Sequence, residues 1–292
     1  MVSPISIWAN VAGAAVLMIG VAVARRELTE GRGLNKLVAL GAAFVAAPLA
    51  AFGMEHQFAA PFMVGGVPKW IPWHLFWVYF VGVALIAAGL SIATNVLRRW
   101  SSLLAGCMIL IFVLTIHLPN VMAKPDNRFF WIVMFRDLAF ASGLWALAAG
   151  CVPGWKGSQA VVFAVRMYLG VLMIFYAVEH FLFPVFAPGV PLENKMPAWV
   201  PAPAILGYLV GALLLAGGVA LLLNLKPFPA RSAAIWLGAV MTAIVVCLYL
   251  PILLMASGTA AIVEGLNYVA DTLLMGGTLL VTAKAMRDGA AS

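Results

Sequence analysis

The chain repeats a glutamate followed directly by a histidine, a combination that could exchange protons with a bound molecule. Glu55-His56 and Glu179-His180 each close a long apolar segment. Imidazole and carboxyl groups are common proton donors and acceptors in catalysis near neutral pH. Ionisable side chains are costly to place in lipid, so they usually face a cavity or a partner. We therefore regard both pairs as candidate proton-exchanging groups.

Further polar residues follow each pair at comparable places. His117 and Tyr249 each stand directly before a Leu-Pro dipeptide, and Asp137 and Asp271 each stand six positions before a glycine. Polar residues on the last apolar segment recur with helical spacing at Glu264, Asn267, Tyr268 and Asp271. Such a stripe predicts a polar cavity or a seam between helices rather than a lipid-facing surface.

A quinone or quinol site near the outer membrane face is the leading hypothesis for these residues. A quinone needs an apolar slot for its tail and a proton donor or acceptor near each carbonyl. The candidate proton-exchanging residues are His56, His180, His117, Asp137 and Asp271, with the aspartates orienting the histidines. The candidate quinone-binding residues are Glu55, Glu179, Tyr249, His74, Trp70, Trp199, Glu264 and Asn267.

Two other interpretations of the polar residues remain open. They could be hydrogen-bonded contacts between helices, with His56 bonded to Asp137 or to a backbone carbonyl and Arg136 paired with Glu55. The histidines at similar depth could instead bind a metal ion or haem. No HExxH motif and no histidine pair at i, i+4 spacing supports that interpretation, and the three cysteines form no CxxC pair. We assign no metal ligand.

Composition predicts that the elements that position these residues are membrane-spanning helices. The chain is 65% hydrophobic and 9% charged, with a mean hydropathy of +1.07. About 20 apolar residues are needed to cross a bilayer. Suitable segments lie at 5–24, 36–60, 73–97, 101–123, 129–150, 160–183, 203–224, 232–256 and 262–283. We expect the first of them to be a retained helix rather than a cleaved signal peptide, because Arg25 follows it and no basic residue precedes it.

The distribution of basic residues predicts the orientation of the chain. With the N-terminus outside, the outer loops contain only Lys69, Lys124, Arg128 and Lys195, and most other basic residues fall in cytoplasmic loops. This asymmetry fits the positive-inside rule for a bacterial inner membrane, with the C-terminus in the cytoplasm. The net charge of +7 is therefore a topology signal, and we expect no nucleic-acid partner.

Internal similarity predicts a tandem repeat. Pro68-x-Trp70-Ile-Pro72 reappears as Pro197-x-Trp199-Val-Pro201, in the same order as the paired residues described above. We expect an N-terminal helix and loop over 1–35, a first four-helix unit over 36–155 and a second over 156–292. The predicted fold is an all-α polytopic membrane protein with nine transmembrane helices, one N-terminal helix plus two tandem four-helix bundles in parallel orientation.

The repeated pattern resembles the DoxX-like family of small bacterial membrane proteins over about residues 36–284, in two copies. The residues of the first copy that carry the resemblance are Glu55, His56, Pro61, Pro68, Trp70, Pro72 and Gly82. Those of the second copy are Glu179, His180, Pro184, Pro197, Trp199, Pro201 and Gly211. The duplication and the additional first helix depart from the single-copy family pattern. The resemblance implies a link to membrane redox systems, such as a subunit of thiosulfate:quinone oxidoreductase.

These observations lead to two functional expectations. The first is a membrane subunit of a redox system that binds a quinone, lies among membrane lipids and receives electrons from a partner protein. A partner is expected because no electron carrier is recognisable in the chain. The second is a non-catalytic carrier or scaffold for a lipid or small molecule, for which the polar stripe would line a substrate path.

Overall fold

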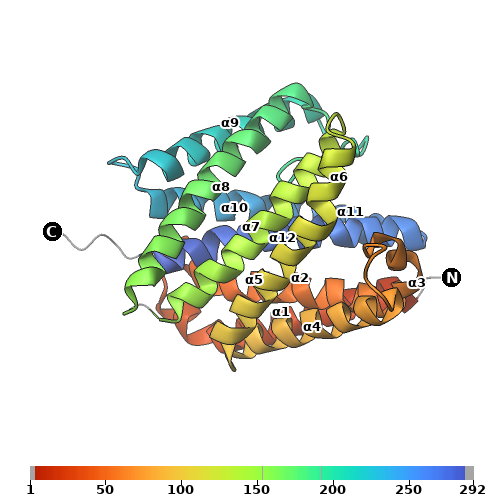
Figure 1. Ribbon diagram of the computed structural model, residues 1–292. Coiled ribbons are helices and arrows are strands. Elements are labelled where there is room, and N and C mark those ends of the chain that lie inside the picture. Colours follow the sequence, from red (N-terminus) through yellow and green to blue (C-terminus); the bar gives the residue numbers. More distant parts are fainter. Residues whose placement is uncertain (1–3, 153, 192, 287–292) are drawn as a thin grey trace.

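The computed structural model describes residues 4–152, 154–191 and 193–286, and its regular elements there are helices (Figure 1). The long helices are α1 (Pro4–Glu30), α2 (Asn35–Phe58), α4 (His74–Thr94), α5 (Arg98–Phe112), α7 (Arg128–Gly150), α8 (Lys156–Leu182), α9 (Pro203–Leu223), α10 (Ala230–Ile244) and α12 (Thr259–Ala285). The shorter ones are α3 (Ala60–Met63), η1 (Val64–Gly66), η2 (Val113–His117), α6 (Leu118–Ala123), η3 (Val245–Tyr249) and α11 (Leu250–Met255).

Within the described residues, nine helical segments are long and apolar enough to cross a membrane. The predicted all-α, multi-pass class is therefore confirmed at that level. α1 extends through Arg25 and Arg26 to Glu30, beyond the predicted segment 5–24. The additional turn is exposed and charged, and Arg26 pairs with Glu30 one turn later at 2.9 Å. Such a turn can continue a helix outside the apolar layer.

A π-helical turn interrupts two of the long apolar segments, Arg98–Ala123 and Ala230–Met255. η2 separates α5 from α6, and η3 separates α10 from α11. A proline stands two residues after each of these turns, at Pro119 and Pro251. A proline ring clashes with the carbonyl four residues earlier, and a widened turn relieves that clash. Each widened turn ends at one of the predicted site residues, His117 or Tyr249.

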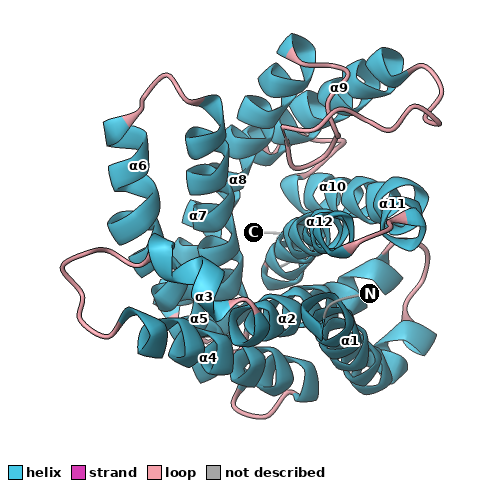
Figure 2. Ribbon diagram, turned by 90° about the vertical axis from the view of Figure 1, so that its right-hand side faces the viewer, coloured by secondary structure: helices cyan, strands magenta, loops and turns pink. Residues whose placement is uncertain are grey.

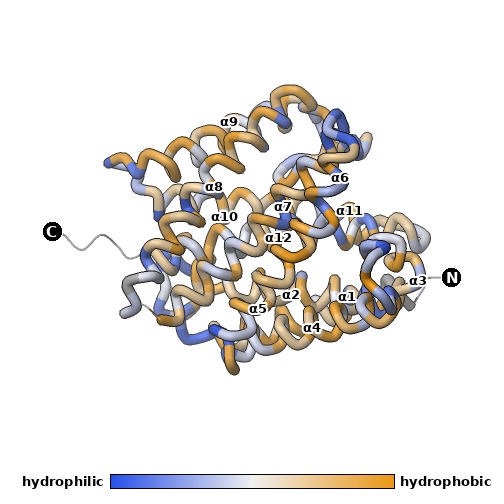
Figure 3. The backbone as a smooth tube through the Cα atoms, in the orientation of Figure 1, coloured by the Kyte–Doolittle hydropathy of each residue, from blue (hydrophilic) through white to orange (hydrophobic). Residues whose placement is uncertain are grey.

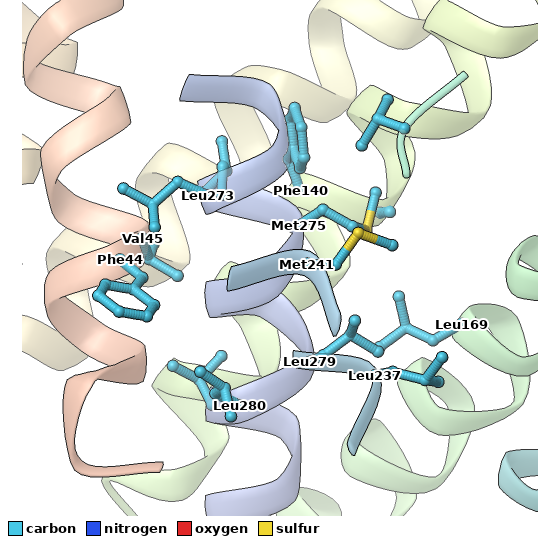
Figure 4. Packing of buried hydrophobic residues seen from close by; sticks show 14 of the residues in the cluster. Phe44, Val45, Phe140, Leu169, Leu237, Met241, Leu273, Met275, Leu279 and Leu280 are labelled. Atoms are coloured by element: carbon cyan, nitrogen blue, oxygen red, sulfur yellow. The ribbon is translucent and has the colours of Figure 1, made fainter. Parts of the chain in front are cut away.

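α12 is the central helix of the molecule, with α1, α2, α7, α8 and α10 around it (Figure 2). In its most apolar stretch 83% of the residues are buried, against 17% in α1. Around α12 lie buried side chains from several other helices, including Phe44 of α2, Phe140 of α7 and Met241 of α10 (Figure 4). α2 and α12 approach closely at Gly277, where an added Cβ would lie 2.8 Å from the Val45 nitrogen.

The prediction of two tandem four-helix bundles is not confirmed in that form. Besides its contacts with α1 and α4, α2 packs extensively against α12, and besides its contact with α9, α8 packs more extensively against α7 than against α12. α7 and α12 also contact each other in the centre. The first helix of each predicted unit thus lies on the last helix of the other unit. Both central helices are largely buried, α7 to 67% and α12 to 83% of their most apolar stretches.

Hydrophilic residues gather toward the two ends of the helices, and the stretches between them are mostly hydrophobic (Figure 3). One end carries α3, α6, α11 and the segment 184–202 (right-hand side of Figure 1). This segment is folded against the protein, with Ala187, Val190 and Met196 buried and a bridge between Phe186 and Lys195. All the predicted site residues belong to elements that reach or approach this end.

Candidate functional site

An arginine joins two aspartates from different helices at the centre of the molecule. Arg136 on α7 lies 2.9 Å from its neighbour Asp137 through Nε and 2.6 Å from Asp271 on α12 through Nη1. The three side chains are mostly buried, with Asp271 the least exposed at 7%. A buried charge is tolerated only when it is paired and hydrogen-bonded. The ion pairs therefore fix the contact between the two central helices.

His117 extends this charged group toward the end of the molecule that carries α6. Its Nε2 lies 2.8 Å from Oδ2 of Asp137, and its Nδ1 has no hydrogen-bond partner among the described residues. Hydrogen bonding to a carboxylate orients an imidazole ring. Asp137 therefore fixes the orientation of the His117 ring.

His117 also lines a pocket of about 170 Å³ between the η2–α6 segment and α7. The pocket walls are Ile116, His117, Asn120, Phe129, Phe130 and Val133. Apart from His117 and Asn120, these side chains are apolar, and two of them are aromatic. A flat ring with a polar edge would find apolar walls and two hydrogen-bonding side chains in such a pocket.

The two glutamates of the Glu-His pairs lie in different electrostatic surroundings. Glu179 forms an ion pair with Arg128, which also lies over the ring of Phe183 at 4.2 Å. Glu55 is 5% exposed, and its Oε1 has no hydrogen-bond partner among the described residues. Glu179 is thus paired with an arginine, whereas Glu55 has no ion-pair partner among the described residues.

The two histidines of these pairs bind their own helices. Nδ1 of His56 lies 2.8 Å from the Phe52 carbonyl, and Nδ1 of His180 lies 2.5 Å from the Tyr176 carbonyl. Each is packed over a glycine of the next long helix, Gly82 or Gly211. Of the two partners that the structural interpretation considers for His56, Asp137 or a backbone carbonyl, the ring is bonded to the carbonyl.

His180 and Tyr249 hold the segment 184–202 instead of facing a cavity. The amide of Gly189 donates to Nε2 of His180 at 2.9 Å, so both ring nitrogens of His180 bond backbone groups. The Tyr249 hydroxyl donates to the Pro188 carbonyl. Both ring nitrogens of His180 and the hydroxyl hydrogen of Tyr249 are thus bonded to this backbone, and the assignment of the two side chains to a quinone site stays a prediction.

Glu264 belongs to a second pocket, of about 240 Å³, beside the segment 184–202. Its carboxylate accepts hydrogen bonds from Asn194 and from the Tyr268 hydroxyl. Trp199 and Lys195 also line this pocket. Two residues of the predicted polar stripe, Glu264 and Tyr268, are therefore together, while Asp271 one turn further belongs to the central ion pairs.

The remaining predicted residues lie apart from both pockets. Trp70 is 74% exposed in the segment before α4, and His74 begins that helix. Asn267 is partly buried on α12 but lines neither pocket. Among the described residues, no group of three His, Cys, Asp or Glu side chains is placed to hold a metal ion.

Sequence reasoning missed the role of two arginines and two phenylalanines. Arg136 was considered as a partner of Glu55, but it binds Asp137 and Asp271. Arg128 was counted only as a loop charge, although it pairs with Glu179. Phe129 and Phe130 stand three and four positions after the Pro125-Asp126 turn, and only their distance from His117 in the fold identifies them as pocket walls.

Comparison with family models, with curated proteins and with solved structures finds no match to this chain. The function therefore has to be inferred from the side chains described above.

Proposed function

We propose that the protein is an integral membrane subunit of a redox system and binds a quinone or quinol beside His117. The observation that carries the proposal is the histidine–aspartate pair at 2.8 Å on the wall of a pocket with two aromatic side chains. His117 would hydrogen-bond one oxygen of the ring and exchange its proton, and Asn120 offers a second polar contact. Asp137 would stabilise the protonated imidazole.

A quinone reaction moves electrons as well as protons, and this chain supplies only the proton-exchanging groups. Reduction of a quinone consumes two electrons and two protons, and oxidation of the quinol returns them. We place the electron carrier in a partner protein. The proposed location is a bacterial inner membrane, with the N-terminus outside and the pockets near the outer face.

The proposed repeat is supported by paired backbone features. Trp73 and Ala202, directly before α4 and α9, both have positive φ, of 57° and 47°. Asn95 and Asn224, directly after these helices, also have positive φ, of 64° and 48°. Residues other than glycine rarely adopt this backbone conformation. Together with the two π-helical turns, these pairs favour two copies of one unit, one over 36–155 and one over 156–292. The DoxX-like identity of that unit is proposed from the sequence resemblance alone.

The test is quinone binding by the purified full-length protein. Mass spectrometry of an organic extract should show close to one quinone per chain. His117→Gln should weaken binding of a short-chain quinone by about tenfold or more, as a lost bond to a buried polar group does. Asp137→Asn should also weaken it, whereas Asp126→Asn makes the same substitution in an exposed loop and should leave the affinity unchanged.

The variant His56→Gln distinguishes a quinone site at His117 from one at the Glu55-His56 pair. Loss of quinone binding in His56→Gln, with full binding in the His117→Gln and Asp137→Asn variants, would move the site to the Glu-His pair. Absence of any bound quinone, with another lipid in its place, would favour the alternative carrier or scaffold. The polar pocket at Glu264 is the observation that favours this alternative, and flux through liposomes without a partner protein would establish it.

A further inference from the structure

The pocket at Glu264 contains charges of both signs that do not neutralise each other. Glu264 lies on α12 and Lys195 in the segment 184–202, and both line the cavity of about 240 Å³. Among the described residues, no ion pair joins the two side chains. A ligand that carries both an ammonium group and an anionic group would contact each of them.

The carboxylate of Glu264 is held in a fixed position by its neighbours. Asn194 and the Tyr268 hydroxyl both donate to Oε1, and Tyr268 is packed against Tyr249 with ring centroids 5.5 Å apart. Oε2 has no hydrogen-bond partner among the described residues. One oxygen thus anchors the carboxylate and the other remains able to accept a hydrogen bond from a ligand.

Aromatic side chains beside this carboxylate favour a cationic ligand group. Tyr268 and Trp199 line the same pocket as Glu264, and Trp199 is 47% exposed. The faces of tyrosine and tryptophan rings attract ammonium groups. Tryptophan is also enriched at the depth of lipid headgroups. A headgroup at the membrane surface could therefore reach the pocket without leaving the bilayer.

The pocket occupies the place in the second half that the His117 pocket occupies in the first half. Ile252 stands 132 positions after Asn120, as Tyr249 does after His117, and Glu264 stands 134 positions after Phe130, as Asp271 does after Asp137. Asn120 and Phe130 line the first pocket, and their counterparts Ile252 and Glu264 line the second. Tyr249, the counterpart of His117, lines neither pocket, and nor do the two aspartates. The first pocket has phenylalanine where the second has a carboxylate, so the two cannot bind the same chemical group equally well.

The geometry points to a second ligand site that binds a zwitterionic headgroup of the phosphoethanolamine type. Glu264 accepts a hydrogen bond from the ammonium group, Tyr268 and Trp199 surround that group, and Lys195 binds the phosphate. The volume of about 240 Å³ suits a headgroup rather than an acyl chain. This site is separate from the proposed quinone site and does not depend on it.

Binding of short-chain lipids to the full-length protein in detergent tests this proposal. Native mass spectrometry and tryptophan fluorescence would compare dihexanoyl phosphatidylethanolamine with dihexanoyl phosphatidylglycerol, which has the phosphate but no ammonium group. The wild-type protein should bind the ethanolamine lipid about tenfold more tightly. Free phosphoethanolamine, tested in parallel, shows whether the site takes a lipid headgroup or a soluble molecule of the same chemistry.

Three variants distinguish the roles of the charges. Glu264→Gln keeps an acceptor for Asn194 and Tyr268, so it should fold, and it should abolish the preference for the ethanolamine lipid. Lys195→Gln should weaken binding of both lipids. Glu193→Gln removes a carboxylate from the same segment outside the pocket and should change nothing. Equal affinity of the wild type for both lipids, or an unchanged preference in Glu264→Gln, would overturn the proposal.

Discussion

At the residue scale, Arg136 determines whether two buried aspartates are tolerated. It is the shared partner of Asp137 and Asp271, and the corresponding position on α12 is Ala270. Removing one partner of a buried ion pair leaves an uncompensated charge, which is far more costly than loss of an exposed pair. The stability of the contact between α7 and α12 therefore depends on this one side chain.

We expect Arg136→Met to destabilise the protein by about 3–5 kcal/mol, the range for a broken buried ion pair. Unfolding of the detergent-solubilised protein by heat or denaturant measures the change. Arg166→Met is the matched control, because Arg166 also lies within a long helix but contacts Phe163 and Met167 rather than a carboxylate. Addition of Asp271→Asn to Arg136→Met should recover part of the loss. Equal stability of the Arg136 and Arg166 variants would contradict the assigned role.

At the element scale, the closeness of α2 and α4 depends on a glycine. A Cβ at Gly82 would lie 2.8 Å from the Gly53 carbonyl oxygen and 2.8 Å from Cβ of His56. Real Cβ atoms do not approach backbone atoms this closely, so a larger residue must separate the helices. His56 would move together with α2, because its bond to the Phe52 carbonyl lies within that helix.

Gly82→Ala should therefore destabilise the protein by about 1–3 kcal/mol, as overpacking of an interior does. Gly65→Ala is the control, since an added Cβ there meets no atom within 4 Å. The same unfolding measurement applies to both variants. A Gly82→Ala variant as stable as Gly65→Ala would show that the two helices can separate at little cost.

At the scale of the whole molecule, the two halves of the chain interlock. α2 lies on α12 and α8 lies on α7, so the central helices are covered by helices from the opposite half (Figure 2). A half expressed alone would leave this apolar surface to lipid and would also leave Asp271 without Arg136. Neither half is therefore expected to be stable by itself.

Division of the chain between Gly154 and Trp155 tests this interdependence. We expect the two fragments to co-purify when they are expressed together, and each to be degraded or aggregated when expressed alone. Size-exclusion chromatography of an affinity-tagged first half would detect the second half. Recovery of a well-folded second half by itself would show that the contacts across the centre contribute little to stability.

The sequence was sufficient to predict the membrane-spanning helices and the polar residues near one end. Helix formation in lipid follows from apolar length, because every backbone polar group must be bonded within its own segment. This requirement is local, so the nine segments could be located from the sequence, although α1 continues six residues beyond its predicted end. His117 and Asp137 were each recognised as candidate site residues, because both are ionisable groups inside apolar segments.

Tertiary structure alone decided which polar residues meet. Arg136 and Asp271 are 135 positions apart, and Arg128 and Glu179 are 51 apart, so no local pattern could pair them. The packing of α7 on α12 brings the first pair together, and the packing of α7 on α8 brings the second. In the packed structure, His180 and Tyr249 hydrogen-bond the backbone of segment 184–202, whereas His117 lines a pocket. Burial favours whichever pairing satisfies most charges and hydrogen bonds at once, and that choice depends on all helices together.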